Sequence, residues 1–120
     1  MTDINKTDEA RKYFEDAIRI SKYYYSPHLN LGTSYLSTAL ISKSSEDFKR
    51  AEYYLTNAIE LKPSSAASHH YLSIVYKETG RFNLAQIHAE KALKLGLPKA
   101  QKRDSLRILD EIQNSDIKEY

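Results

Sequence analysis

Amphipathic stretches with helical spacing alternate along this chain with short polar breaks that carry proline, glycine or serine. The clearest stretch, Ala58-Ile59-Glu60-Leu61-Lys62-Pro63, has counterparts upstream at Ala17-Ile18-Arg19-Ile20 and downstream at Ala92-Leu93-Lys94-Leu95. The leading alanines of the three copies are separated by 41 and then 34 residues. A period of this size is typical of stacked helical repeats.

A second pattern recurs with the same offset of 41 residues. A histidine, a leucine, a small residue and a tyrosine appear twice at helical spacing: His28, Leu31, Gly32 and Tyr35, then His69, Leu72, Ser73 and Tyr76. A further 34 residues along, only the leucine is retained, as Leu106. That loss is expected of an atypical terminal copy.

The spacing predicts an all-α chain of about six helices separated by capping signals. Thr7 is predicted to cap the first helix, which runs to about Tyr24, and Ser26 with Pro27 is predicted to open the second. The cluster Ser42-Lys43-Ser44-Ser45 should separate the second helix from the third. The remaining helices are predicted over 48–61, from the Ser64-Ser65 cap to Gly80, over 81–95, and over 98–114.

Packing expectations follow for two of these helices. Gly32 lies inside the second helix, where glycine costs about 1 kcal/mol against alanine, so we expect the third helix to approach its backbone near Ala51. The last helix should cover the preceding repeat with Leu106, Leu109 and Ile112 and turn its charges to water.

These residues resemble the tetratricopeptide repeat family, whose 34-residue unit places a leucine-glycine pair, a tyrosine, a glycine, an aromatic residue, two alanines and a proline in order. The two fuller copies carry the resemblance at Leu31, Gly32, Tyr35, Phe48, Ala51, Ala58 and Pro63, and at Leu72, Tyr76, Gly80, Phe82, Ala85 and Ala92. The chain departs from the pattern in four ways: histidines 28 and 69 replace the usual tryptophan, Ser73 replaces the glycine, Pro98 comes one place late, and the first repeat is seven residues longer.

The resemblance implies a single domain built as a right-handed α-solenoid of stacked antiparallel helix pairs. It would comprise a half repeat over 8–24 that supplies only a second helix, full repeats over 25–65 and 66–97, a capping helix over 98–114 and a tail over 115–120. In this family the first helices of successive repeats line a concave groove that binds peptides or helices of partner proteins. By register, the groove residues here are Leu29, Asn30, Thr33, Leu36, His70, Tyr71, Ile74, Lys77, Asp104 and Ile108.

The resemblance also excludes one kind of partner. Some family members bind the acidic C-terminus of heat-shock chaperones with two lysines, two asparagines and an arginine at set groove positions. Those positions hold Leu29, Thr33, Tyr71, Gln101 and Ser105 here, so that clamp is absent. We expect a protein or peptide partner of another kind, with Tyr71 as the best single anchor because buried aromatics dominate interface energetics.

Composition excludes several other classes of function. The formal net charge is only +2, and although Lys91, Lys94, Lys99, Lys102, Arg103 and Arg107 form a basic region, interleaved carboxylates favour a solvated face over a phosphate or nucleic-acid site. No apolar run is long enough to span a bilayer. There is no cysteine, which excludes disulfides and thiolate metal sites. Met1 to Thr7 lacks the apolar core of a signal peptide, so the sequence predicts a cytoplasmic location.

No pattern indicates catalysis, a cofactor or a metal. The three glycines form no phosphate-binding loop, and nothing places a serine on a nucleophile elbow. His28 and His69 occupy equivalent repeat positions, which favours a packing role, and His70 has no histidine or carboxylate three or four residues away. The sequence therefore predicts a non-catalytic adaptor or scaffold.

One alternative remains open beside the adaptor. The first helix lacks the partner helix that a full repeat would supply, and it carries an apolar face of Phe14, Ile18 and Ile20. That face could serve self-association into a homo-oligomer, in which case the chain would be a structural unit.

Overall fold

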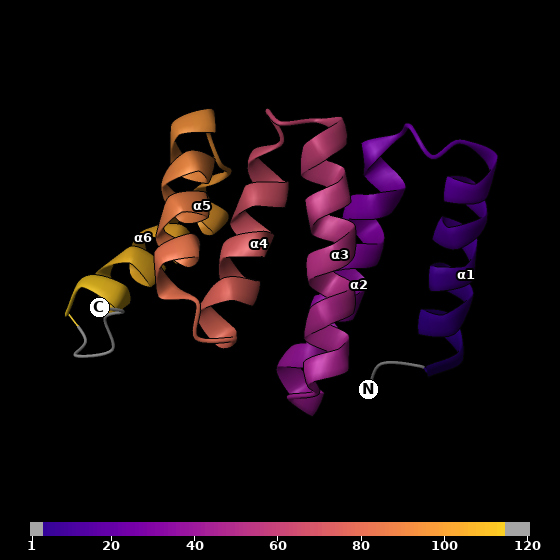
Figure 1. Ribbon diagram of the computed structural model, residues 1–120, viewed down its shortest axis with the longest axis horizontal. Coiled ribbons are helices and arrows are strands. Elements are labelled where there is room, and N and C mark those ends of the chain that lie inside the picture. The colour runs from indigo at the N-terminus through magenta and orange to yellow at the C-terminus, as the bar shows by residue number, and fades with distance from the viewer. Residues whose placement is uncertain (1–3, 115–120) are drawn as a thin grey trace. The chain divides into compact units, whose positions relative to one another are not determined.

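The computed structural model describes residues 4–114, which form six α-helices and contain no strand. The chain divides into two compact units, Met1–Pro63 and Ser64–Tyr120. The first contains α1 (Ile4–Ile20), α2 (Tyr25–Ser42) and α3 (Ser45–Leu61), and the second contains α4 (Ala66–Glu78), α5 (Phe82–Leu95) and α6 (Lys99–Asn114) (Figure 1). The predicted all-α fold of consecutive packed helices is confirmed. The predicted tail over 115–120 lies outside the described residues.

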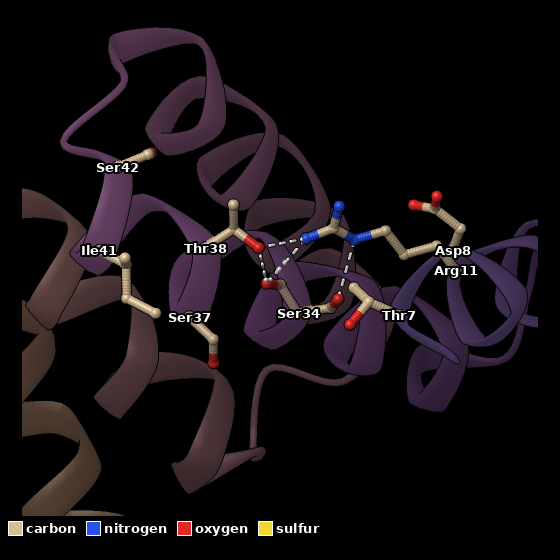
Figure 2. Close-up of a pocket in the computed structure, with 8 residues that line it drawn as sticks. All are labelled: Thr7, Asp8, Arg11, Ser34, Ser37, Thr38, Ile41 and Ser42. Carbon is tan, nitrogen blue, oxygen red and sulfur yellow. Dashed lines mark hydrogen bonds between the residues drawn. The ribbon is translucent and has the colours of Figure 1, made fainter. Parts of the chain in front are cut away.

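In the first unit α2 packs against both of its neighbours, and Arg11 makes the polar part of its contact with α1. The Arg11 Nε donates to Ser34 Oγ at 2.9 Å, and its Nη2 donates to the Ser34 carbonyl at 3.1 Å and to Thr38 Oγ1 at 2.6 Å (Figure 2). The guanidinium also lies 4.1 Å from the centroid of the Tyr35 ring. Arg11 thus fixes α1 on α2 where few apolar side chains are available.

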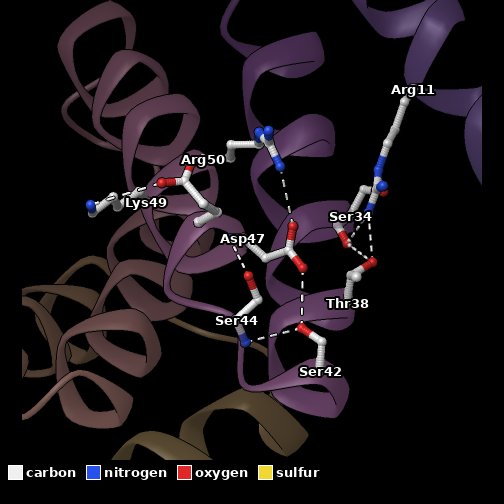
Figure 3. A network of polar contacts seen from close by, with 9 residues as sticks. Arg11, Ser34, Thr38, Ser42, Ser44, Asp47, Lys49 and Arg50 are labelled. Atoms are coloured by element: carbon white, nitrogen blue, oxygen red, sulfur yellow. Dashed lines mark hydrogen bonds and ion pairs between the residues drawn. The ribbon is translucent and has the colours of Figure 1, made fainter.

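The connection between α2 and α3 is built from hydroxyls, as predicted. Lys43 takes a left-handed conformation and Ser44 caps α3 by accepting from the Asp47 amide at 3.4 Å. Ser42 Oγ accepts from the Ser44 amide and donates to the Asp47 carboxylate (Figure 3). These bonds satisfy donors that a helix start would otherwise leave free.

Two predicted helix starts are wrong. α1 begins at Ile4, so Thr7 lies inside the helix, and it ends at Ile20 before a turn. α2 begins at Tyr25 with Tyr24 as an extended N-cap that forms no side-chain cap bond, so Ser26 is not the cap. The first-turn amides of a helix have no intrahelical partner, so a proline is tolerated anywhere in that turn. The position of Pro27 therefore does not determine which residue is the N-cap.

The close approach predicted at Gly32 is present, but the residue opposite is Leu55 and not Ala51. A Cβ at Gly32 would lie 2.6 Å from Leu55 Cγ and 3.2 Å from the Leu55 amide nitrogen. In the second unit the equivalent positions are Ser73, 41 residues on, and Ala89, 34 residues on, and both are fully buried. A glycine opposite a leucine is thus replaced by a serine opposite an alanine.

The second unit follows the same plan with one error in the predicted core. Ser65 caps α4, and Gly80 closes it with φ +80°, both as predicted. α6 buries Ser105, Ile108 and Ile112, whereas Leu106 of the predicted face is 50% exposed and Leu109 is half-buried. The true stripe contains a serine, which a pattern of apolar positions does not reveal.

We predict that Gly32→Ala destabilises the protein by about 1 to 3 kcal/mol, because the added methyl overpacks against Leu55 and this exceeds the gain of about 1 kcal/mol in helix propensity. Urea denaturation of wild type and variant gives the difference in the free energy of unfolding. Leu55→Ala supplies the control: the double variant should lose less stability than the sum of the two single losses. A Gly32→Ala protein as stable as wild type would contradict the close-contact explanation.

Candidate functional site

The exposed face that α4 and α6 share in the second unit contains the predicted aromatic anchor. Tyr71 is half-buried, and its hydroxyl accepts a hydrogen bond of 3.3 Å from Gln101 Nε2 of α6. The ring also lies 5.2 Å from that of His70, centroid to centroid. Contacts on two sides hold the Tyr71 ring in one orientation while part of it remains accessible.

Charged residues lie near this anchor on the same two helices. Lys77 Nζ of α4 forms an ion pair of 2.6 Å with Glu111 of α6, and this hydrogen bond lowers the pKa of the Glu111 carboxyl. Asp104 pairs with Arg107 one turn further along α6 at 3.4 Å. Each predicted charge therefore has a partner of opposite sign, and Ile74 lies half-buried on α4 one turn from Tyr71.

Two residues predicted for this face are buried beneath it. His70 is 2% exposed and Ile108 is 4% exposed. His70 Nδ1 lies 2.7 Å from Ser105 Oγ, a hydrogen bond that ties α4 to α6. A serine beside a histidine is the composition of an acyl-transfer site, but Ser105 is fully buried and no substrate carbonyl can reach it. His70, Ser105 and Ile108 therefore support the face from below.

The corresponding residues of the first unit lie on α2. Leu29, Asn30 and Thr33 are half-buried, while Leu36 is 3% exposed. The Thr33 hydroxyl donates to the Asn30 carbonyl at 3.0 Å, within the helix. Leu29, Asn30 and Thr33 are thus accessible to a ligand, and Leu36 belongs to the core.

The residues predicted for self-association differ in their accessibility. Ile20, at the end of α1, is 86% exposed and Tyr13 is 71% exposed, while Phe14 and Ile18 are half-buried. The Phe14 and Tyr13 rings meet edge to face at 5.7 Å. α1 therefore presents apolar surface on both sides of Phe14.

A histidine pair joins α4 to α5, and the sequence analysis did not find it. His69 Nδ1 lies 3.0 Å from His88 Nδ1, and the two rings are 22° from parallel. The His88 ring also contacts the Tyr76 ring, with the two centroids 5.4 Å apart. The hydrogen bond requires a proton on one Nδ1 and none on the other, so doubly protonated rings cannot form it.

The geometry also contains a cavity that the sequence gave no reason to expect. About 400 Å³ lies between α1 and α2, lined by Thr7, Asp8, Arg11, Ser34, Ser37, Thr38, Ile41 and Ser42 (Figure 2). No residue type in that set is diagnostic by itself, and only the packing of α1 on α2 brings the eight together.

Residues 4–114 contain neither a metal-binding cluster nor a membrane-spanning helix. Histidine, aspartate and glutamate side chains there form no cluster of three or more that could hold a metal ion. No helix in that range is both long and apolar enough to cross a bilayer.

We predict that stability falls as the pH is lowered from about 7.5 to about 5, because two histidines resist protonation in the fold. Burial lowers the pKa of His70, and burial together with the neighbouring His69 lowers that of His88. A base with a depressed pKa contributes its full stability above its unfolded value of 6.5 and loses it as the pH falls below that value. Urea denaturation across this range measures the slope.

Several titratable and charged groups lie around His88 and could also contribute to the pH dependence, so control variants are needed. They are His69 and Tyr76 from α4, and Glu90, Lys91 and Lys94, which line the same hollow on α5. His88→Gln and His70→Gln should each flatten the slope, since glutamine keeps a polar partner without titrating. Glu111 loses its contribution below pH 4.5, outside the measured range. An unchanged slope in both variants would show that other groups set the pH dependence.

Comparison with known proteins agrees with the helical pairs. A tetratricopeptide repeat model matches residues 2–24, a segment that contains the whole of α1. The search of curated proteins found no match. Proteins of this family generally mediate protein–protein interactions and are generally non-catalytic. The match shows that the segment containing α1 is similar to a tetratricopeptide repeat, and the pairing of α2 with α3 and of α4 with α5 agrees with that similarity.

Proposed function

We propose that this chain is a protein-binding adaptor or scaffold that holds an extended peptide or an amphipathic helix on the α4–α6 face. The Tyr71 ring is the observation that carries the proposal, because it is accessible yet held by Gln101 and His70. A side chain already fixed in its bound rotamer loses little entropy on binding, and aromatic anchors carry a large share of interface energy. Leu29, Asn30 and Thr33 on α2 are a second proposed contact surface.

The charges of the α4–α6 face narrow the class of partner. The Lys77–Glu111 and Asp104–Arg107 pairs leave the face without a strong field of either sign. A segment with apolar side chains and few charges suits this surface better than a polyanion or polycation. Since the chain has no cysteine, its fold needs no disulfide, which suits the proposed cytoplasmic site of action.

Replacing Tyr71 by alanine should weaken peptide binding by about 1 to 3 kcal/mol and leave the fold intact, because the side chain is only half-buried. Peptides selected from a displayed random library on the wild-type protein supply the ligands, and calorimetry measures their affinity. Tyr71→Phe keeps the ring but loses the Gln101 bond, so its loss should be smaller. Tyr13→Ala, at an exposed tyrosine of the other unit, is the matched control. Equal affinity of wild type and Tyr71→Ala for all selected peptides would refute the anchor.

A second candidate function is self-association through α1. Its support is the exposed apolar surface of Tyr13 and Ile20 beside the half-buried Phe14 and Ile18. We expect sedimentation velocity to show a concentration-dependent dimer that Ile20→Lys dissociates, since a charge at the contact costs desolvation. Tyr53→Lys, which changes an exposed aromatic on α3, should have no effect. A strict monomer at high concentration removes this candidate.

A further inference from the structure

The guanidinium of Arg11 is a half-buried charge that has no counter-ion among the described residues. No ion pair involves it among the residues that the structure describes, although α1 and α3 carry several carboxylates. Asp8 lines the same cavity one turn away without pairing with it. Taking a charge partly out of water without a partner is unfavourable, so the site is incomplete as it stands.

The hydrogen bonds of Arg11 show which part of the guanidinium is unused. A guanidinium has five N–H donors. The single Nε–H is directed at Ser34 Oγ, and Nη2 is bonded to the Ser34 carbonyl and to Thr38 Oγ1. Nη1 forms no hydrogen bond with the residues drawn around the cavity (Figure 2). Among the described residues no hydrogen bond uses these two donors, and the other side of the guanidinium is held by Ser34 and Thr38 of α2.

The position of this group is also restrained from the side. The guanidinium lies over the Tyr35 ring at 4.1 Å, and that ring is in turn stacked 5.9 Å from the Tyr54 ring, 5° from parallel. The cation therefore cannot swing away without losing three hydrogen bonds and a cation–π contact. A charged donor held this firmly is preorganised for an anion.

We propose that the cavity between α1 and α2 binds a carboxylate side chain of a partner peptide, with Arg11 Nη1 as the charged donor. The hydroxyl of Ser37 lines the cavity as a further polar contact, and the exposed Ile41, which also lines it, suits an apolar neighbour in the peptide. The inference rests on the proposed protein-binding function, but it concerns the first unit and a different set of residues.

The charge of Asp8 favours a carboxylate over a phosphate. Its side chain lines the cavity, so a bound anion meets one negative charge as well as one positive charge. Asp8 repels a phosphoserine, which carries nearly two negative charges, more strongly than a carboxylate with one, and this repulsion offsets the stronger attraction of the phosphate to Arg11. The site thus matches aspartate or glutamate better than a phosphorylated residue.

The test uses three capped pentapeptides that differ at one position: acetyl-Gly-Leu-Asp-Leu-Gly-amide and its asparagine and phosphoserine counterparts. NMR titration of the whole chain at millimolar peptide follows the backbone amides of α2 and the Arg11 Nε–H. The aspartate peptide should bind about tenfold more tightly than the asparagine peptide, since a charge-assisted bond is lost. Raising the salt concentration should reduce that difference.

Three variants change the site. Ser37→Glu places a carboxylate in the cavity, so it should abolish binding of the aspartate peptide, and the introduced carboxyl should show a lowered pKa. Ser37→Gln introduces a side chain of the same size as glutamate but without its charge, so it should lose much less affinity than Ser37→Glu. Arg11→Lys keeps the charge but loses the planar guanidinium with its paired donors. The affinity of the aspartate peptide for this variant should fall to that of its asparagine counterpart.

Several outcomes would overturn the proposal. They are equal affinity for the aspartate and asparagine peptides, unchanged binding by Ser37→Glu, or tighter binding of the phosphoserine peptide. Tyr71→Ala, measured in the same titration, separates this inference from the proposed function. Selected peptides that respond to Tyr71 but not to the Ser37 and Arg11 variants would defeat the carboxylate site alone. Selected peptides whose affinity is unchanged by Tyr71→Ala would refute the Tyr71 anchor without affecting the conclusion about Arg11.

Discussion

The close approach of paired helices is the constraint on which each unit depends. In the first unit the backbone of Gly32 meets Leu55 so tightly that even a Cβ would overlap it. In the second unit Ser73 and Ala89 occupy the same positions, so the side-chain volume is shared differently between the two helices. The summed side-chain volume that fits between the two helices matters more than the identity of either residue. This explains how the second repeat dispenses with the helix glycine.

Equivalent repeat positions in the two units hold buried or half-buried polar rings, but these rings make different contacts. His69 pairs with His88, and the equivalent positions of the first unit hold His28 and Tyr54, whose rings lie 6.3 Å apart. The tyrosine stacks on Tyr35 instead, and His28 Nδ1 stays buried without a hydrogen-bond partner among the described residues. One unit thus uses a titratable hydrogen bond where the other uses aromatic stacking. Their stabilities should therefore respond differently to pH.

The periodic features of the fold could be predicted from the sequence, and the non-periodic ones could not. Helices α3 to α5, their caps and the glycine contact follow from apolar spacing and cap chemistry, which are local. The starts of α1 and α2 were missed because Thr7 and Ser26 resemble caps, and the buried face of α6 was missed because Ser105 is a polar core residue. Among the groove residues, register alone could not separate Tyr71 from the buried His70 beside it. Arg11 was missed because only tertiary packing gives its three bonds.

In each unit, hydrogen bonds and ring contacts within the fold orient a side chain that is still partly accessible to a ligand. The bond from Gln101 and the contact with His70 orient the free part of the Tyr71 ring. Ser34 and Thr38 occupy one side of the Arg11 fork, and Nη1 forms no hydrogen bond with the residues drawn around the cavity. A side chain fixed by its own fold loses little freedom when a ligand arrives, so a small surface can bind with useful affinity. Short stacked helices are well suited to this, since their exposed side chains stand on rigid backbones.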